Sequence, residues 1–269
     1  MKILFIGDIF GKPGREIAQR AIPALVAQHG IDLVVANVEN SAAGFGVTGD
    51  IAETILRYGV DVMTSGNHIW DKKEVLEYIP RQPRLLRPAN FPAGVPGRGS
   101  WVGQTRTGEP VAVINLMGRI FMSPLDDPFA IVLKEIEAVR RKARVIIVDF
   151  HAEATSEKVA MGWHLDGRAT AIFGTHTHVQ TADERLLPKG TAYLTDVGMT
   201  GPYDSIIGVT VEAALGRFVN GMPAKFEAAT GPARLNAIII TADPASGRAL
   251  GIERLNLSLQ DVAAMAHHV

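Results

Sequence analysis

The sequence contains no cysteine, which excludes disulfide bonds, thiolate nucleophiles, cysteine-ligated zinc and iron–sulfur clusters. Aromatic residues make up 6% of the chain, and 27 Lys and Arg against 28 Asp and Glu give a net charge of −1. This balance provides no overall positive charge for binding bulk nucleic acid or an anionic membrane. No apolar run approaches the roughly 18 residues that a membrane span needs. Any phosphate-bearing partner must therefore be bound by a local group of residues.

The composition is that of a compact folded protein, with 47% hydrophobic residues and a mean hydropathy of +0.13. The Pro- and Gly-rich segment 80–103 is expected to be a long surface loop and not a linker, because a strand-like segment follows with no change in composition. We therefore expect a single domain over residues 1–269. The apolar start ends at Asp8 and no small-residue cleavage site follows, so a cytoplasmic protein is expected.

Short apolar runs alternate with amphipathic segments over the first two-thirds of the chain. Strands are expected at 3–6, 33–38, 60–64, 111–116, 144–150 and 169–174, and helices at 15–28, 51–58 and 127–141. This alternation is typical of βαβ units and predicts an α/β protein. In the last third helix signals are scarce, and we expect antiparallel strands at 191–197, 206–212, 235–242 and 251–257 and a frayed end at 263–269.

Residue types that bind metals follow five of the predicted strands, at the point where each strand ends. The carboxyl ends of strands in an open α/β sheet meet at one crevice, which is where ligands bind. These residues are Asp8, Glu39, Asn40, Asn67, His68, His151, His176 and His178.

Each of these residues also has a structural explanation. Asp8 can cap the following helix, Glu39 and Asn40 can start a turn, and the Asn67-His68 pair can belong to a tight turn. A lone histidine such as His151 at the end of a buried strand is more often a core residue than a ligand. Together, however, the set favours a functional site over a coincidence of separate structural roles.

Three histidines, two carboxylates and two asparagines can fill two coordination spheres that share a carboxylate, which suits metal ions about 3.5–4 Å apart. Mixed nitrogen and oxygen ligands favour iron, manganese or zinc over magnesium or calcium without deciding among the three. These features predict a two-metal hydrolase acting on phosphate esters. His68, beside a predicted ligand, suits protonation of the leaving oxygen.

The same residues resemble the motif series of the calcineurin-like metallophosphoesterases, in the same order along the chain. Two features depart from that superfamily: Phe10 stands where a histidine is usual, and Glu39-Asn40 stands where an aspartate is usual. Both match one branch, the bacterial YmdB-like metallophosphoesterases, which the chain resembles over nearly its whole length. The strings that carry this resemblance are GDIFGKPGR, VENSAAGFG, SGNHIWD, DFHAEATSEK, GTHTHVQTADE and TDVGMTGPYDSIIG.

This resemblance implies a four-layer αββα sandwich and a di-metal phosphodiesterase of cyclic nucleotides, with 2',3'-cyclic AMP as the expected substrate. It implies two divalent or mixed-valence ions per chain, iron or manganese foremost, with zinc as the alternative. A metal-bound hydroxide would attack phosphorus and His68 would protonate the departing ribose oxygen. One ion would be held by Asp8, Glu39, Asn40 and His178, and the other by Glu39, Asn67, His151 and His176.

Two other functions remain open at the level of sequence. A phosphomonoesterase or a nuclease would use the same metals and differ in the walls of the cleft. A regulatory protein would keep the fold and act through RNA or a protein partner, although the near-neutral charge lacks the basic, aromatic surface of an RNA binder. A homo-oligomer is compatible with apolar strands in the last third, with no feature that sets its symmetry.

Overall fold

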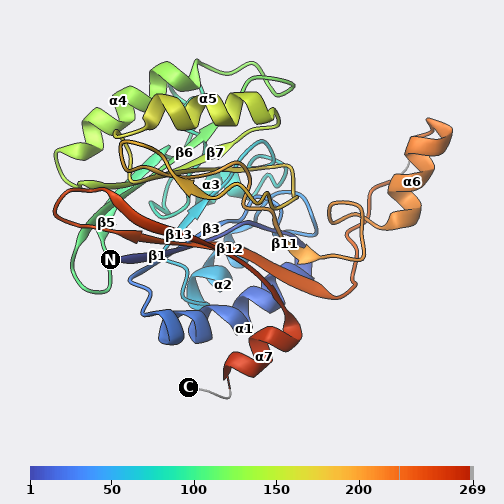
Figure 1. The fold of residues 1–269 in the computed structure, drawn as a ribbon. Helices are drawn as coiled ribbons and strands as arrows, with labels where there is room; N and C mark the ends of the chain where they lie inside the picture. The colour runs from blue at the N-terminus through green and yellow to red at the C-terminus, as the bar shows by residue number, and fades with distance from the viewer. Residues whose placement is uncertain (224, 267–269) are drawn as a thin grey trace.

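The computed structural model describes residues 1–223 and 225–266, which form two mixed β-sheets packed face to face with helices outside them (Figure 1). The predicted α/β class is confirmed. In the described residues, the first sheet has the order β2-β11-β12-β1-β3-β4, with β13 paired to β12, and the second the order β5-β6-β7-β8-β10-β9. The first comprises β1 (Lys2–Ile6), β2 (Asp8–Ile9), β3 (Leu33–Asn37), β4 (Val62–Thr64), β11 (Met199–Pro202), β12 (Ala233–Ala242) and β13 (Ala249–Ser258). The second comprises β5 (Ser100–Gln104), β6 (Pro110–Met117), β7 (Val145–His151), β8 (Ala171–Thr175), β9 (Arg185–Leu186) and β10 (Ala192–Leu194).

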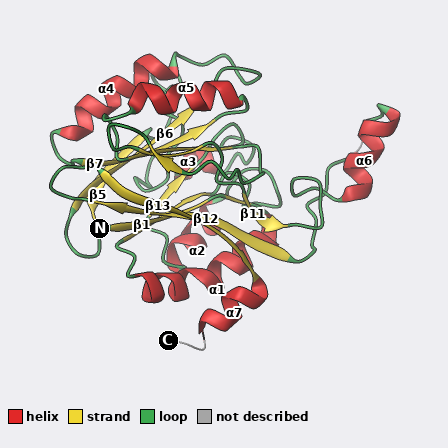
Figure 2. Cartoon of the chain, viewed as in Figure 1, coloured by secondary structure: helices red, strands yellow, loops and turns green. Residues whose placement is uncertain are grey.

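Helices cover the outer faces of both sheets, as Figure 2 shows. The first sheet packs against α1 (Gly11–His29), α2 (Gly49–Arg57) and α7 (Leu259–Ala266), and the second against α4 (Pro128–Arg140) and α5 (Thr155–Leu165). The short helix α3 (Val75–Tyr78) packs beside the first sheet, whereas α6 (Val211–Asn220) projects away from the body. None of the helices in the described ranges has both the length and the apolarity needed to cross a membrane.

The central strands are apolar on both faces because each face packs against a different layer. In β1, Ile3 and Phe5 point into the core between the sheets, where Phe5 meets Phe173 of β8 with ring centroids 4.2 Å apart. Leu4 and Ile6 point the other way, into the core beneath α1 and α2. Alternate side chains of this one strand therefore pack into the hydrophobic cores on both faces of the sheet.

Most of the elements predicted in the first two-thirds are confirmed within a few residues. The helix predicted at 127–141 is α4, whose N-terminus is capped by Asp127, which accepts a hydrogen bond from the backbone N–H of Phe129 at 3.0 Å. The predicted loop 80–103 is largely irregular, but its last residues enter the edge strand β5.

The last third of the chain departs from the prediction in three places. The predicted strand at 206–212 is wrong, because that segment forms isolated bridges and then begins α6. β10, within the predicted strand 191–197, pairs antiparallel to β9 as expected but parallel to β8, whereas β12 and β13 are antiparallel as expected. At the C-terminus, α7 continues to Ala266, and positions 267–269 of the predicted frayed end lie outside the described residues.

Candidate metal centre

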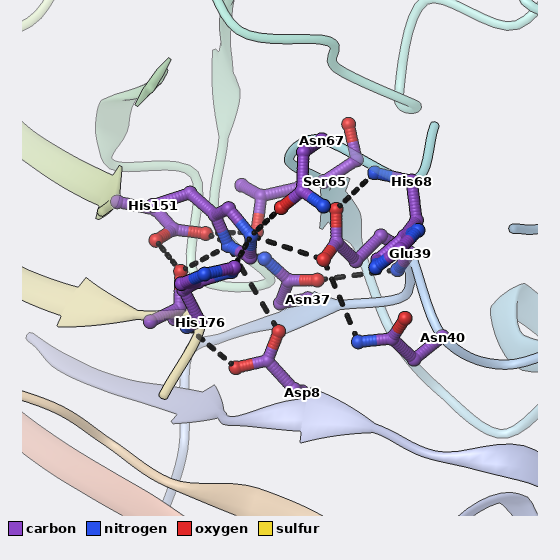
Figure 3. Close-up of polar contacts among 12 residues, drawn as sticks. Asp8, Asn37, Glu39, Asn40, Ser65, Asn67, His68, His151 and His176 are labelled. Atoms are coloured by element: carbon purple, nitrogen blue, oxygen red, sulfur yellow. Dashed lines mark hydrogen bonds and ion pairs between the residues drawn. The ribbon is translucent and has the colours of Figure 1, made fainter. Parts of the chain in front are cut away.

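The predicted ligands meet at the carboxyl ends of strands from both sheets, and not at the edge of one open sheet as the sequence suggested. β1, β3 and β4 of the first sheet lead into Asp8, Glu39 and Asn67, whereas β7 and β8 of the second lead into His151 and His176. Figure 3 shows these side chains pointing toward one another between the sheets.

Four of the predicted ligands form one compact group around the ring of His151. Its Nε2 lies 2.9 Å from Asn67 Oδ1, 3.0 Å from Glu39 Oε1 and 3.0 Å from His176 Nδ1. Ligand atoms of Glu39, His151 and His176 all lie within 4.8 Å of one another. These four residues are the set expected to hold one of the two ions.

Two members of the other predicted set, Asn40 and His178, meet beside the same oxygen of Glu39. Asn40 Nδ2 lies 3.0 Å from His178 Nε2 and 3.5 Å from Glu39 Oε1. Asp8 is fully buried and contacts members of the first set: its Oδ2 accepts a hydrogen bond from the backbone N–H of His176 at 3.2 Å, and its Oδ1 lies 3.9 Å from His151 Nδ1. Glu39 Oε1 therefore contacts members of both sets, as a shared carboxylate requires.

The chemistry of this group fits metal ions. Asp8 Oδ1 and Asn40 Oδ1 are buried and have no hydrogen-bond partner among the described residues. Unsatisfied buried oxygens are costly, and the lone pairs that crowd around His151 Nε2 cannot all be satisfied by one proton. Cations among these donors would satisfy the carboxylate, amide and imidazole groups together.

Burial and mutual charge shift the ionisation of the central residues. Burial alone would raise the pKa of Glu39, but the charge and hydrogen bond of His151 outweigh it and lower that pKa to about 2. Burial opposes the charged form of His151, yet Glu39 raises the pKa of His151 to about 9. Burial and the charge of His151 lower the pKa of His176 to about 3, which leaves His176 neutral at pH 7. A neutral imidazole is the form that binds a metal.

A buried network beneath the centre fixes the orientation of His151. Thr175 Oγ1 donates to Asp149 Oδ1 at 2.7 Å, and because a hydroxyl has one proton, it accepts from His151 Nδ1–H at 2.9 Å. Asp149 also accepts from Thr64 at 2.5 Å and from Asn37 at 3.2 Å. Burial nevertheless raises the pKa of Asp149 to about 7. The network holds Nδ1 of His151 and thereby directs its Nε2 atom toward the other ligands, where a bound metal would take the place of the proton.

Replacing Thr175 with valine should therefore weaken metal binding while preserving the shape of the side chain. Loss of a partner that orients a ligand reduces metal affinity by about 10- to 100-fold in comparable sites. Calorimetric titration with Mn²⁺ measures the change, with Thr54→Val on the surface of α2 as the matched control. Equal affinity for Mn²⁺ in Thr175→Val and wild type would show that the hydroxyl does not position His151.

The backbone at the centre adopts conformations that the ligand positions require. His176 and His178 both have positive φ angles, 102° and 65°, which are uncommon for non-glycine residues and cluster at functional sites. His178 Nδ1–H donates to the carbonyl of Ile207 at 2.8 Å, so its Nε2 faces Asn40. At Gly66, a Cβ atom would lie 2.0 Å from the ring of His151, so a side chain there would displace this ring.

His68 lies at the mouth of the centre and outside both ligand sets. Its Nδ1–H donates to Asp71 at 2.7 Å, and its ring packs edge-on against Phe45 with centroids 5.1 Å apart. The backbone N–H of His68 donates to Glu39 Oε2 at 3.0 Å. The Nε2 atom thus remains for a ligand, and the residue is tied to the bridging carboxylate through its main chain.

A cavity of about 320 Å³ opens beside the ligands, and its lining combines polar and apolar side chains. Its polar lining residues include Glu39, Asn40, His68, His176 and His178. The other walls are largely apolar and include Phe10, Phe45, Ile207, Phe218 and Phe226, the last three from the segment that carries α6. A ligand with a phosphate at one end and an apolar ring at the other matches this cavity.

The sequence did not indicate several residues that the structure places at this site. Asn37, Thr64, Asp149 and Thr175 lie inside strands, where buried polar residues give no spacing signal. Glu153, whose Oε2 lies 3.0 Å from His176 Nε2, follows the predicted ligand His151 by two positions. Phe10, which stands where a histidine is usual in the superfamily, is buried with its ring edge-on to His178 and contributes to the cavity wall.

Comparison with known proteins yields closely similar sequences and structures. A family model described as YmdB-like protein matches residues 4–255. A 2',3'-cyclic-nucleotide 2'-phosphodiesterase of Bacillus subtilis is 49% identical over 95% of this chain and 96% of its own length. A putative phosphatase/phosphodiesterase of Mycoplasma pneumoniae is 37% identical over 97% of this chain and 94% of its own.

Two solved structures superpose on the chain with a TM-score of 0.90. One is a hypothetical protein of Thermus thermophilus, with 44% identity, covering 96% of this chain and 99% of that one. The other is described as a novel phosphatase of Mycoplasma pneumoniae, with 36% identity, covering 96% of this chain and 93% of that one.

Proposed function

This protein belongs to the YmdB-like family, and we propose that it is a metal-dependent phosphodiesterase that hydrolyses 2',3'-cyclic nucleotides, with 2',3'-cyclic AMP as substrate. The observation that carries the reaction class is the meeting of carboxylate, amide and imidazole donors around two buried, unpartnered oxygens. The substrate class follows from the Bacillus subtilis relative, whose activity is exerted on the 2' ester of a 2',3'-cyclic nucleotide.

The ions are held by the two ligand sets that meet at Glu39. We assign Asp8, Glu39, Asn40 and His178 to one ion, and Glu39, Asn67, His151 and His176 to the other. When bound, iron or manganese, with zinc as the alternative, supplies positive charge to the phosphate oxygens and lowers the pKa of a water molecule. Because Glu39 is ionised with a pKa of about 2, it can serve both ions across the neutral range.

His68 has the position of the proton donor to the departing ribose 2' oxygen. Asp71 accepts from its Nδ1–H and fixes the ring, which leaves Nε2 free to hold the transferred proton. The tie from its backbone to Glu39 sets the distance between donor and ligands. A general acid that is already oriented loses little conformational entropy on reaching the transition state, which lowers the barrier to proton transfer.

The cavity offers different lining residues to the phosphate and to the base of a nucleotide. The phosphate would lie against the metal ligands and His68, while the base would lie against the aromatic side chains of Phe45 and Phe218. Aromatic faces stack on bases, and apolar walls exclude water from the reacting phosphate. A phosphate ester without a base would leave this part of the cavity unfilled.

The proposal also covers the layered architecture of the fold and the oligomeric state of the protein. The two sheets with helices outside each would form the four-layer αββα sandwich of the calcineurin-like metallophosphoesterases (Figure 1). A single domain over residues 1–269 and a homo-oligomer stay predictions.

Turnover of a panel of phosphate esters tests the proposed function. Protein reconstituted with Mn²⁺ or Fe²⁺ would be given 2',3'-cyclic AMP, 3',5'-cyclic AMP, bis-nitrophenyl phosphate and a nitrophenyl monoester. We expect 2',3'-cyclic AMP to have the highest kcat/KM, because it joins a strained diester to a base that fits the cavity. Preference for the monoester would indicate a phosphomonoesterase. Absence of turnover on the whole panel, with both metals bound, would favour a regulatory binding protein.

A further inference from the structure

Basic side chains surround a second hollow at the end of the second sheet opposite the metal centre. Its volume is about 270 Å³. It lies where chain segments lead into the amino ends of β7, β8 and β10, whereas the metal ligands follow the carboxyl ends of strands. Five cations from four separate segments line it: Arg140 and Arg144 flank the turn between α4 and β7, and Arg168, Lys189 and Arg248 come from three other segments.

In the part of the chain that the structure describes, these five cations lack a carboxylate partner. Within residues 1–223 and 225–266, none of the five forms an ion pair within 4.0 Å. Arg140 donates to the carbonyl of Arg168, and Arg144 donates to the carbonyl of Ala245, so neutral backbone groups hold these guanidinium groups.

The two nearby carboxylates are used by the backbone of adjoining turns. Asp166 accepts from the backbone N–H of Lys189 at 3.0 and 3.1 Å. Asp243 accepts from the N–H groups of Ala245 and Ser246 and from the Ser246 hydroxyl. Both carboxylates thus serve to shape the hollow, and its side-chain charge is left positive.

Helix ends account for a small part of this charge. α4 ends at Arg140 and α5 ends at Leu165, and a cation is favoured near the C-terminus of each helix. That effect explains one basic residue at each end, but not five that converge from distant parts of a chain with a net charge of −1. Like charges held around one hollow repel each other unless an anion lies among them.

We propose that this hollow binds a small anion with at least two phosphate groups, of the pyrophosphate class. A single phosphate is satisfied by one or two guanidinium groups, whereas five cations match a more highly charged anion. A neighbouring hollow shares Arg140 and Arg144 and adds Arg141 and Lys142, so the positive charge continues past the first phosphate position. The lining residues of both hollows contain no aromatic side chain, unlike the stacking surfaces of single-stranded nucleic-acid binders.

Glycines form three of the turns that line the hollow. Gly247 has a φ of 76°, and a Cβ atom there would lie 2.4 Å from the carbonyl oxygen of Arg144, so this turn packs directly on the backbone before β7. Gly167 and Gly190 also have positive φ, and Cβ atoms there would lie 2.8 Å from the side chain of Lys189 and 3.3 Å from that of Arg248. Glycine at these two positions therefore leaves room for the side chains of the cations.

Calorimetric titration of the full-length, metal-loaded protein with inorganic pyrophosphate tests this proposal. The variant Arg144→Gln/Arg248→Gln removes two charges from the hollow, and the control Arg20→Gln/Arg81→Gln removes two exposed charges elsewhere. We expect the control to bind like wild type and the hollow variant to bind at least about tenfold more weakly. Pyrophosphate that binds at the metal centre contributes equally in all three proteins, so it does not account for the difference.

Three results would overturn the proposal. The first is equal affinity for pyrophosphate in the hollow variant and the control variant, with thermal unfolding confirming that both are folded. The second is binding of inorganic phosphate as tightly as pyrophosphate. The third is tighter binding of a single-stranded RNA oligonucleotide than of pyrophosphate through the same arginines, which would assign the surface to nucleic acid.

Discussion

Replacing His68 with alanine is expected to lower the turnover number for 2',3'-cyclic AMP by about 10²- to 10⁴-fold, the range for loss of a general acid. The ring lies outside both ligand sets, bound to Asp71 through Nδ1, so the variant should keep its metal content. KM should change little, because the side chain acts on the leaving oxygen in the transition state. Steady-state kinetics together with elemental analysis of bound metal gives both quantities.

Asn67→Ala, one position earlier, is expected to behave differently. Asn67 Oδ1 lies 2.9 Å from His151 Nε2 within the predicted ligand set, so its loss should remove one metal along with nearly all activity. His29→Ala, at the end of α1 and away from the site, is the matched control and should match wild type in both readouts. Equal loss of metal in the His68 and Asn67 variants would make His68 a ligand and end its assignment as proton donor.

The sequence was sufficient to locate the donors because their positions follow from local rules. A strand that is apolar on both faces must be covered by layers on both sides, and ligands of α/β sheets bind beyond the carboxyl ends of such strands. Polar ligand types at those ends, as in His151 after Val145–Phe150, therefore stand out from the pattern around them. The order of these motifs along the chain then indicated the resemblance to the metallophosphoesterase family.

The remaining features depend on contacts between distant segments. That β10 pairs parallel to β8 is decided by the path of the intervening segment 176–191, which includes β9, and residues 191–197 carry no signal of direction. The predicted strand at 206–212 contains the β-branched residues Ile206, Val209 and Val211, but its last two positions begin α6. The first turn of α6 packs through Ala214 on Phe10 and Val209, in a cluster that joins residue 10 to residues about 200 positions later in the chain. Local propensity was overridden by tertiary packing.

The hydrogen-bond network around Asp149 could not be predicted from the sequence, because it also depends on contacts between distant segments. A buried aspartate within an apolar strand has no partner in its own segment, and its three donors come from β3, β4 and β8. The basic hollow has the same origin, because its five cations come from distant parts of the chain and meet through turns. Composition provides only the net charge of the whole chain, which does not show where positive side chains gather on the surface.

Replacing Asp196 with asparagine is expected to destabilise the protein by about 3–5 kcal/mol at pH 7, the range for breaking a buried ion pair. Asp196 and Lys158 are 1% and 2% exposed, with Nζ 2.6 Å from Oδ2. The variant leaves the Lys158 ammonium buried without its counter-charge. Asp196 also accepts from the N–H and hydroxyl groups of Thr177, so the loop between His176 and His178 loosens as well.

The size of this loss should depend on pH. Burial alone would raise the pKa of Asp196, but the charge and hydrogen bond of Lys158 outweigh it and lower the pKa below the ordinary 3.8. A carboxylate with a depressed pKa stabilises the fold fully above the unfolded-state value, and this contribution is lost as pH falls below it. The difference in free energy of unfolding between wild type and Asp196→Asn should therefore be largest near pH 7 and shrink toward pH 3.

Urea unfolding at pH 7 and pH 3 measures this difference, with Asp126→Asn, an exposed aspartate, as the control expected to change little at either pH. The double variant Asp196→Asn/Lys158→Met separates the two sources of the loss. If the unpaired ammonium dominates, its removal should recover most of the lost stability, because apolar residues can replace a buried ion pair. If the double variant is as unstable as Asp196→Asn, the hydrogen bonds to Thr177 and Gly198 hold the loop, and the ion pair contributes little of its own.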